Sequence, residues 1–212
     1  MHGLGDVRFF DRTAPLYDRL MPPANGEALA AGLDHATRPI DRLLDVGGGS
    51  GRAAAALSGP EITVVDVSLE MLARARGARG LAGVAGDAGR LPFRDASVDA
   101  VTVVDAFHHL PDQAAAIREA ARVLAPGGAL VVREFDPEHP LGRAVVAGEH
   151  AIGMASRFRT PSDLAAAFDD AGLDPRIVER GFGYTVVGVA NLSGDGDADA
   201  APVGADGKTD LG

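Results

Sequence analysis

The stretch LLDVGGGSGRAA, Leu43 to Ala54, joins an apolar, strand-like run to a turn with four glycines in five positions. Glycine readily adopts the left-handed backbone conformations that a tight turn requires. In doubly wound α/β sheets, ligands bind where a buried strand runs through such a turn into a helix. What this turn holds therefore decides both the fold and the ligand.

Two common phosphate-binding patterns do not fit the turn. A dinucleotide fingerprint needs a small residue at the position of Arg52, counted from Gly47 and Gly49, and no lysine with a following hydroxyl residue marks a nucleoside triphosphate loop. The pattern present is Asp45 followed by Gly47, Gly49 and Gly51. A carboxylate here would repel a phosphate and favour a cationic ligand. S-adenosylmethionine, a cation with an adenosine and no phosphate, meets both conditions.

Strands and helices alternate along most of the chain. Most of the strands are continuously apolar, which is typical of a parallel sheet covered by helices on both faces. The predicted strands are 43–46, 62–65, 81–85, 100–104, 129–135, 175–180 and 184–190, and the predicted helices are 9–20, 26–38, 50–57, 68–79, 111–124 and 161–171. The stretch 137–160, rich in proline, histidine and glycine, is expected to be a connector.

The overall composition is that of one globular domain. A chain of 212 residues with 46% hydrophobic residues buries a sizeable core. The absence of cysteine excludes disulfides, thiolate metal sites and a cysteine nucleophile. The sequence has no apolar run long enough to span a bilayer and no secretory signal at its start, so we expect a cytoplasmic protein.

The charge pattern is unusual. A net charge of −10 argues against a protein that grips nucleic acid, so no nucleic-acid partner is expected. Lys208 is the only lysine, and aspartate far outnumbers glutamate. Such a surface is suited to a high-salt cytoplasm and predicts a halophilic source. Codon bias in a GC-rich genome is the alternative explanation for the missing lysine.

Two acidic residues beyond the turn support an adenosine-containing ligand. Asp66 ends the second strand 21 positions after Asp45, a spacing at which a carboxylate accepts hydrogen bonds from both ribose hydroxyls. Asp66 could instead cap the following helix, a role for which Ser68 competes. Asp87, in the segment GDAGRLPF, is placed to accept a hydrogen bond from an adenine amino group, or else to form an Asx turn.

The motifs LLDVGGGSG, VVDVSLEML, GDAGRLPF, DAFHHL and RVLAPGGALVVREFDP occur in the order and spacing of class I S-adenosylmethionine-dependent methyltransferases, which the chain resembles from about residue 11 to 190. FFDRTAPLYDRL, DVGGGSG and LVVREFDP most resemble the C-methyltransferases of ubiquinone and menaquinone biosynthesis and their small-molecule relatives. The resemblance implies a Rossmann-like, seven-stranded, mostly parallel sheet of order 3-2-1-4-5-7-6 with strand 7 antiparallel. Where the quinone enzymes usually have GLRNV, this chain has AFHHL, so the acceptor stays open.

The resemblance also assigns roles to individual residues. It implies that the glycine turn and Ser50 cradle the methionine end of the cofactor, with Asp45 near its ammonium group, and that Asp66 binds the ribose. It places Met71 beside the adenine, lets Asp87 and Ala88 read the adenine edge, and puts Tyr17 in a lid over the cofactor. The expected organisation is amino-terminal helices and lid in 1–40, a methyltransferase core in 41–192 and a disordered acidic tail in 193–212.

The chemistry expected of this site is modest. Methyl transfer from a sulfonium depends mainly on in-line positioning, and a base is needed only where the nucleophile keeps a proton. His108 or His109 is the candidate general base, with Glu134 as a similar candidate, and the spacing of these residues predicts no metal site. The apolar side chains of Met154 and Phe158, with those of the amino-terminal helix, favour a flat or apolar small-molecule acceptor.

Two other functions stay open at this point. A protein with these motifs could bind S-adenosylmethionine as a sensor or partner subunit without methylating anything. A nicotinamide-dependent reductase is the third interpretation, and Arg52 in the glycine turn counts against it. The sequence leaves the acceptor atom and the oligomeric state open.

Overall fold

The computed structural model of the chain describes residues 25–192. The predictions for residues 9–20, for Tyr17 in the lid and for the acidic tail lie outside these residues. Within the described part, seven strands form one sheet in the order β3-β2-β1-β4-β5-β7-β6. The strands are β1 Arg42–Val46, β2 Glu61–Asp66, β3 Ala82–Ala85, β4 Val98–Val104, β5 Leu124–Phe135, β6 Leu173–Glu179 and β7 Gly183–Ala190.

The sheet has the predicted topology. β3, β2, β1, β4 and β5 pair in parallel, and β7 is antiparallel to both β5 and β6. All seven residues of β4 are buried, as expected for a mostly apolar strand in the middle of a parallel sheet. The chain order changes direction between β1 and β4, so the carboxyl ends of these strands form the crevice in which such folds bind ligands.

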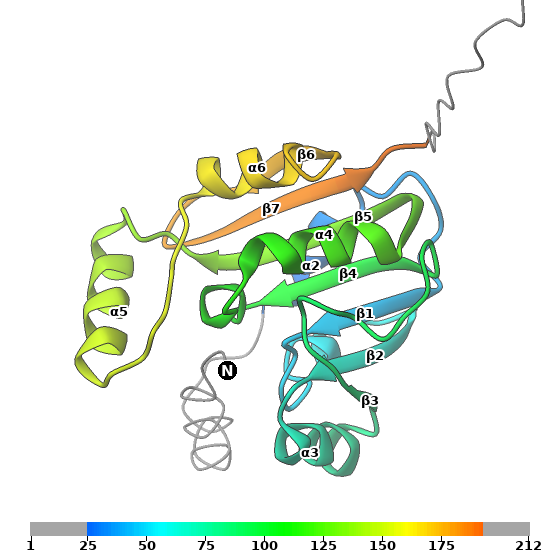
Figure 1. Cartoon of the computed structure of the whole chain (residues 1–212), viewed down its shortest axis with the longest axis horizontal. Coiled ribbons are helices and arrows are strands. Elements are labelled where there is room, and N and C mark those ends of the chain that lie inside the picture. Colours follow the sequence, from blue (N-terminus) through cyan, green and yellow to red (C-terminus); the bar gives the residue numbers. More distant parts are fainter. Residues whose placement is uncertain (1–24, 193–212) are drawn as a thin grey trace, which may run out of the picture.

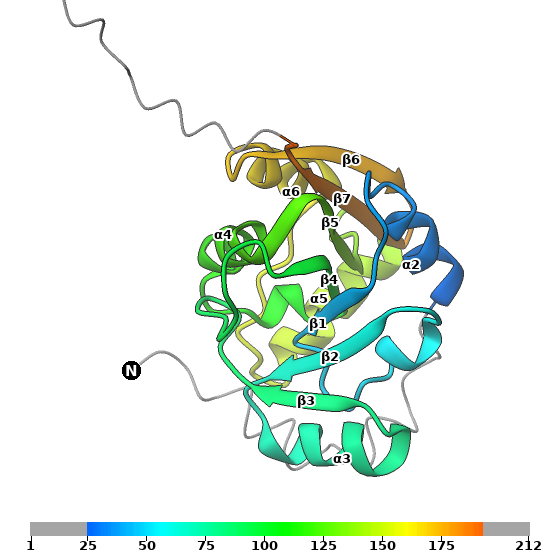
Figure 2. The same cartoon turned by 90° about the vertical axis from the view of Figure 1, so that its right-hand side faces the viewer.

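Helices cover both faces of the sheet, as predicted (Figure 2). On one face, α4 (Gln113–Val123) buries Ile117 against the central strands, and α6 (Pro161–Asp169) buries Phe168 against β6 and β7. On the opposite face, α2 (Gly26–Leu33) packs Leu29 and Leu33 against β5 and β7. α3 (Leu69–Arg79) covers β2 and β3. None of the described helices is both long and apolar enough to span a membrane.

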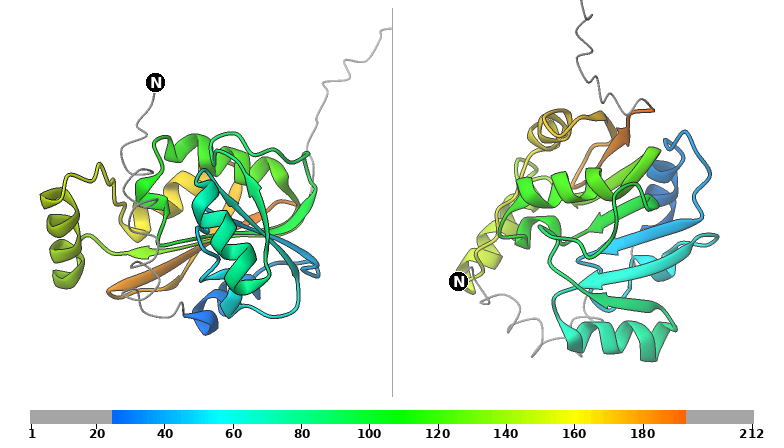
Figure 3. Two further views of the ribbon diagram at one scale, coloured as in Figure 1. Left: turned by 90° about the horizontal axis from the view of Figure 1, so that it is seen from below. Right: turned by 45° about the vertical axis from the view of Figure 1, so that its right-hand side comes forward.

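The connector expected between 137 and 160 contains a helix, α5 (Pro140–Ala151), so that expectation is wrong. The helix begins with a proline in its first turn, and His139 caps it by accepting a hydrogen bond from the Leu141 amide (3.2 Å). Histidine is not among the common capping residues, so the sequence gave little indication that a helix begins here. α5 stands away from the sheet at one end of the molecule (Figures 1 and 3).

Short 3-10 turns follow the ends of β1 and β4. The helix expected over 50–57 is only a short 3-10 turn, η1 (Ala54–Ala56), because the glycine turn extends to Gly51 in the left-handed region. The two histidines lie beyond β4, in a second 3-10 turn, η2 (Phe107–His109). Asp105 breaks the strand before η2 with a φ of 50°, an unusual value for a residue other than glycine.

Candidate active site

The glycine turn after β1 has the conformation that its sequence predicts. Gly47, Gly49 and Gly51 have φ values of 68°, 55° and 79°, all in the left-handed region where side chains are disfavoured. The Gly51 amide donates to the carbonyl of Gly48 (2.8 Å) within the turn. A Cβ atom at Gly48 would lie 2.4 Å from a carboxylate oxygen of Asp45, so the backbone lies directly on that side chain. The glycine positions of the turn thus offer backbone atoms, and no side chains, to a ligand.

Asp45 lies beneath this turn and is fully buried. Its Oδ1 accepts a hydrogen bond from the Thr102 hydroxyl (2.9 Å), whereas its Oδ2 has no hydrogen-bond partner among the described residues. Burial raises the pKa of Asp45 to about 6, and the hydrogen bond from Thr102 offsets only part of that rise. A buried carboxyl oxygen without a partner is costly, so this position is suited to a ligand that brings a hydrogen-bond donor or a positive charge.

Asp66 connects the turn to the end of β2. Its Oδ2 accepts from the Gly49 amide (2.9 Å) and its Oδ1 from the Ser68 amide (2.8 Å). Ser68 caps α3 by accepting from the Met71 amide (3.2 Å), so it is Ser68 and not Asp66 that caps this helix. A Cβ atom at Gly49 would lie 3.8 Å from Met71 Cε and 3.9 Å from Asp66 Oδ2. The structure therefore brings together three residues that the sequence assigned to one ligand.

Asp87 and Ala88 follow β3 in a compact turn. Asp87 Oδ1 accepts from the Gly89 amide (2.8 Å), which is the Asx turn considered as the alternative for this residue. Ala88 is buried. The Gly86 amide donates to the Asp66 carbonyl (3.1 Å), so the turn is tied to the end of β2. The contact of Asp87 and Ala88 with the adenine stays a prediction. The two residues lie next to Asp66, the candidate for binding the ribose.

Arg52 forms an ion pair that the sequence did not indicate. Its guanidinium lies 2.8 Å from the Asp105 carboxylate, and both side chains are largely buried. Burial raises the pKa of Asp105, although the hydrogen bond from Arg52 acts in the opposite direction. The pair joins the residue after the glycine turn to the residue that ends β4. Arg52 thus helps to fix the two loops on either side of the crevice.

His108 is held on both sides by carboxylates. Its Nδ1 lies 2.6 Å from Glu134 Oε2, and its Nε2 lies 3.5 Å from Glu149 Oε1. Burial alone would lower the pKa of His108, but the two carboxylates outweigh it and raise that pKa to about 10. Because both ring nitrogens already face an acidic partner, the geometry favours a positioning role for His108 over the role of general base. Glu134, on β5, also accepts from the Phe107 amide (2.7 Å).

α5 and the residues after it close around this histidine. The Ser156 hydroxyl donates to Glu149 and lies 3.4 Å from Nδ1 of His109. Burial tends to raise the pKa of Glu149, but hydrogen bonds from His108 and Ser156 lower it overall. The Phe158 ring stacks on His108 with a centroid distance of 4.3 Å. Glu149 and Ser156 are site residues that sequence reasoning missed, because they lie 40 or more residues from the histidines in the chain.

The predicted site residues thus form two groups. The first surrounds the turn after β1 and contains Asp45, the glycines, Asp66 and Met71, with the Asp87 turn beside it. The second surrounds η2 and contains His108, His109 and Glu134. A Cβ atom at Gly47 would lie 3.0 Å from the Cβ of Ala106, the residue before η2, so the two groups adjoin.

Comparison with known proteins gives a consistent picture. Residues 44–132 match the family described as a methyltransferase domain. A demethylmenaquinone methyltransferase of a Mycobacterium species (strain KMS) is 44% identical over 170 residues, which are 74% of this chain and 73% of that protein. The 27-O-demethylrifamycin SV methyltransferase of Amycolatopsis mediterranei is 33% identical over 165 residues, 70% of this chain and 59% of that protein. The chain spans about three fifths of the length of several curated relatives.

A solved structure agrees with the sequence comparison. An S-adenosylmethionine-dependent methyltransferase from Thermotoga maritima superposes with a TM-score of 0.71 at 25% identity, covering 87% of this chain and 99% of that one. The fold, the turn and these relatives together show that the chain belongs to the class I S-adenosylmethionine-dependent methyltransferases.

Proposed function

We propose that this protein transfers a methyl group from S-adenosylmethionine to a small-molecule acceptor. The observation that carries the proposal is the convergence of the Gly49 backbone, the Asp66 carboxylate and the Met71 side chain at the carboxyl ends of β1 and β2. This is the edge of the sheet at which an α/β fold of this order binds its ligand. The relatives support the same reaction class, since they are named as methyltransferases.

The residues around the turn fit this cofactor. Asp45 lies directly beneath the glycine backbone, and its buried Oδ2 is the acceptor that we assign to the ammonium group of the methionine end. Asp66 would accept from the ribose hydroxyls, and Met71 would pack against the adenine. When bound, S-adenosylmethionine supplies a methyl group whose bond to sulfur breaks as the bond to the acceptor forms, which leaves neutral S-adenosylhomocysteine. Any acceptor proton passes to solvent or to a nearby base.

The acceptor would lie on the η2 side of the turn. Ala106 adjoins Gly47, and the partly exposed ring of Phe158, stacked on the buried ring of His108, supplies a flat surface beside the end of β5. Such surfaces favour an aromatic or otherwise planar acceptor. We take a quinone precursor as the first compound to test, because a relative that is 44% identical is named for that substrate.

The decisive experiment separates methyl transfer from cofactor binding. The full chain is titrated with S-adenosylmethionine by calorimetry and then incubated with a demethylated naphthoquinol, simple phenols, carboxylates and amines. Release of S-adenosylhomocysteine together with an acceptor heavier by one methylene supports the proposal. Binding without transfer to any acceptor would favour the alternative of a sensor or partner subunit. NADH binding tighter than S-adenosylmethionine would revive the reductase.

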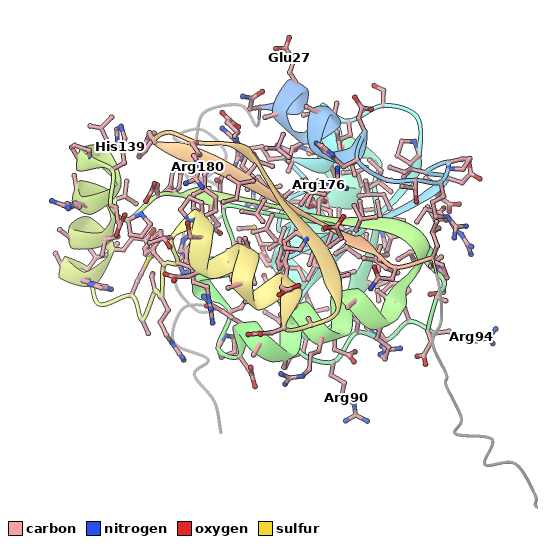
Figure 4. All side chains as sticks on the ribbon, turned by 90° about the horizontal axis from the view of Figure 1, so that it is seen from above. Glu27, Arg90, Arg94, His139, Arg176 and Arg180 are labelled. Carbon is pink, nitrogen blue, oxygen red and sulfur yellow. The ribbon has the colours of Figure 1, made fainter. Side chains whose placement is uncertain are left out.

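The surface chemistry supports a halophilic source, which we propose as a separate point. Charged side chains such as those of Glu27, Arg90 and Arg94 project into solvent (Figure 4). Acidic residues outnumber basic ones by 30 to 20, and the net charge of the chain is −10. Self-repulsion among acidic groups weakens as salt screens it. A melting temperature that rises steadily from low to molar KCl supports this source, and one that does not change contradicts it.

A further inference from the structure

Three side chains beside the cofactor turn point their donor atoms at one place. His108 and His109 come from η2 and Glu149 from α5, and one ligand atom from each lies within 4.8 Å of the other two. His108 Nε2 and Glu149 Oε1 are already 3.5 Å apart. Two ligands of a tetrahedral zinc ion, with bonds of about 2.0–2.2 Å, lie roughly 3.4 Å from each other. The pair formed by His108 and Glu149 therefore already has the spacing of two metal ligands, and a ligand atom of His109 lies within 4.8 Å of both.

The orientation of His108 is the one found for metal-binding histidines. A histidine that ligates a metal commonly donates its other ring N–H to a carboxylate, which fixes the ring and makes the free nitrogen a better ligand. Here Glu134 Oε2 lies 2.6 Å from Nδ1, and this leaves Nε2 directed at Glu149. Glu134 is itself buried and anchored by the Phe107 amide (2.7 Å), so β5 holds the ring firmly in place.

The other two side chains also have outer partners. The Ser156 hydroxyl donates to Glu149 and lies 3.4 Å from Nδ1 of His109. Phe158 covers one face of the His108 ring, with the two ring planes 11° apart, and keeps water from that side. The His108 and Glu149 side chains are 3% and 18% exposed, so the place is enclosed and still reachable. Every residue of the trio is thus supported by a neighbour, as in a built metal site.

We propose that His108, His109 and Glu149 bind a divalent first-row transition metal ion, such as Zn²⁺, with Glu134 orienting His108. Two imidazoles and one carboxylate are a common protein ligand set for zinc, and they leave one coordination position for water or substrate. The sequence predicted no metal here, because Glu149 is 40 residues beyond His109 and lies in the stretch that was expected to be a connector. An ion pair without metal is the competing arrangement of the same groups.

The position of the site suggests how the ion acts. Ala106, which adjoins Gly47 of the cofactor turn, lies two residues before His108. An ion there would bind an oxygen of the acceptor and favour its loss of a proton to solvent. This part of the inference rests on the proposed methyl transfer, whereas metal binding itself does not.

The test measures metal binding directly on the full chain. The protein is stripped with a chelator, then titrated with Zn²⁺ against a chromogenic competitor and with Co²⁺, whose visible bands report tetrahedral coordination. We expect one ion per chain and tetrahedral Co²⁺ bands. Glu149→Gln and His109→Ala should lower the affinity by at least about 100-fold, and Glu134→Gln by about 10–100-fold.

The matched control is His35→Ala, which removes a histidine just beyond the end of α2, away from η2 and α5, and should leave metal affinity unchanged. S-adenosylmethionine affinity, measured in every variant, shows that the variant is folded. Equal Zn²⁺ affinity in the native chain and in Glu149→Gln, or no tetrahedral Co²⁺ bands, would overturn the metal site. If metal fails to bind while S-adenosylmethionine binds normally, only this inference falls. If metal binds and S-adenosylmethionine does not, only the proposed function falls.

Discussion

The two sides of the crevice are assembled in different ways. We call the turn after β1 with the ends of β2 and β3 the cofactor side, and η2 with the end of β5 and residues 140–158 the histidine side. On the cofactor side, Asp66 accepts a hydrogen bond from a backbone amide 17 positions away in the chain, and Asp87 accepts one from an amide only two positions away. On the histidine side, the linked residues are 26 and 47 positions apart. The turns of the cofactor side are thus shaped mainly by contacts between residues close in the chain, with the Thr102–Asp45 hydrogen bond, 57 positions apart, as an exception. The histidine side is made by tertiary packing.

This difference predicts separate sensitivities. A substitution on the histidine side should change folding stability more than cofactor affinity, because buried charged side chains hold that region together. A substitution on the cofactor side should change cofactor affinity more than stability, because the turn is built from backbone. Single substitutions on each side can test this separation.

The largest effect is expected for Glu134→Ala. Removing this buried carboxylate leaves Nδ1 of His108 and the Phe107 amide without an acceptor, and the loss of one partner from a buried pair costs about 3–5 kcal/mol of unfolding free energy. Urea denaturation measures this loss. The control is Glu138→Ala, an exposed position on the loop after β5, which should stay within about 0.5 kcal/mol of the native chain. A loss below about 1 kcal/mol for Glu134→Ala would show that packing alone holds η2.

The second prediction concerns pH and Asp45. The unfolded chain loses this proton near pH 3.8 and the folded chain near pH 6, so the folded state holds the extra proton between these values. Stability therefore falls as pH rises through this window, by on the order of 2–3 kcal/mol in total. Asp45→Asn removes this contribution. The unfolding free energy of the native chain minus that of the variant should fall by this amount between about pH 4 and pH 7.

The affinity for S-adenosylmethionine should also depend on the protonation of Asp45, but it should rise with pH, whereas stability falls. An ammonium group beside Asp45 favours the ionised form, so S-adenosylmethionine affinity of the native chain should rise roughly tenfold from about pH 5 to pH 7. The amide that Asp45→Asn introduces has no proton to lose, so the variant should show no such rise. Parallel pH profiles for the two proteins would mean that Asp45 does not face the cofactor's ammonium group.

The same contrast explains which features could be predicted from the sequence. The apolar runs and the glycine turn predicted the parallel sheet, because such a sheet follows from continuous apolar strands joined by helices, and the motif order of the family supplied the strand order. The spacing from Asp45 to Asp66 placed the second carboxylate at the turn, and Asp66 indeed accepts from the Gly49 amide. These signals are local, so a single stretch of sequence is enough to carry each of them.

The histidine side could not be predicted in the same way. His108 and His109 were recognised as candidates, but their partners Glu149 and Ser156 lie on a helix and a loop that the sequence presented as a connector. The Arg52–Asp105 ion pair was not predicted for a related reason, since it joins two loops whose residues are 53 positions apart in the chain. Such contacts depend on where the sheet places its loops, which no single stretch of sequence encodes.

The third prediction concerns a substitution on the cofactor side, Asp66→Ala. Asp66→Ala removes the acceptor of the Gly49 and Ser68 amides and, on our proposal, of the ribose hydroxyls. Hydrogen bonds to a charged group contribute about 1.5–3 kcal/mol, so S-adenosylmethionine should bind roughly 10–150-fold more weakly by calorimetry. Asp163→Ala, an exposed acidic residue in the first turn of α6, serves as the control and should leave the affinity unchanged. Unchanged affinity in Asp66→Ala would remove this residue from the cofactor site.

The smallest loss is expected where the two sides meet, at Gly47→Ala. The residue has a φ of 68° and a Cβ there would lie 3.0 Å from the Cβ of Ala106, so the substitution strains the turn and presses on the residue before η2. The left-handed conformation alone costs about 1–2 kcal/mol for a residue with a side chain. Both the unfolding free energy and the S-adenosylmethionine affinity should therefore fall, which makes this the one variant expected to affect both sides.

Gly77→Ala should change the unfolding free energy in the opposite direction and serves as the control for Gly47→Ala. Gly77 lies inside α3, is exposed, and has no neighbour within 4 Å of an added Cβ, so alanine should stabilise the protein by about 0.5–1 kcal/mol through the smaller entropy of the unfolded chain. Urea denaturation of both variants, with calorimetry of the cofactor, distinguishes strain in the turn from a general response to alanine. If Gly47→Ala were to match Gly77→Ala in sign, the turn would adapt to a side chain, and its backbone would not couple the cofactor side to η2.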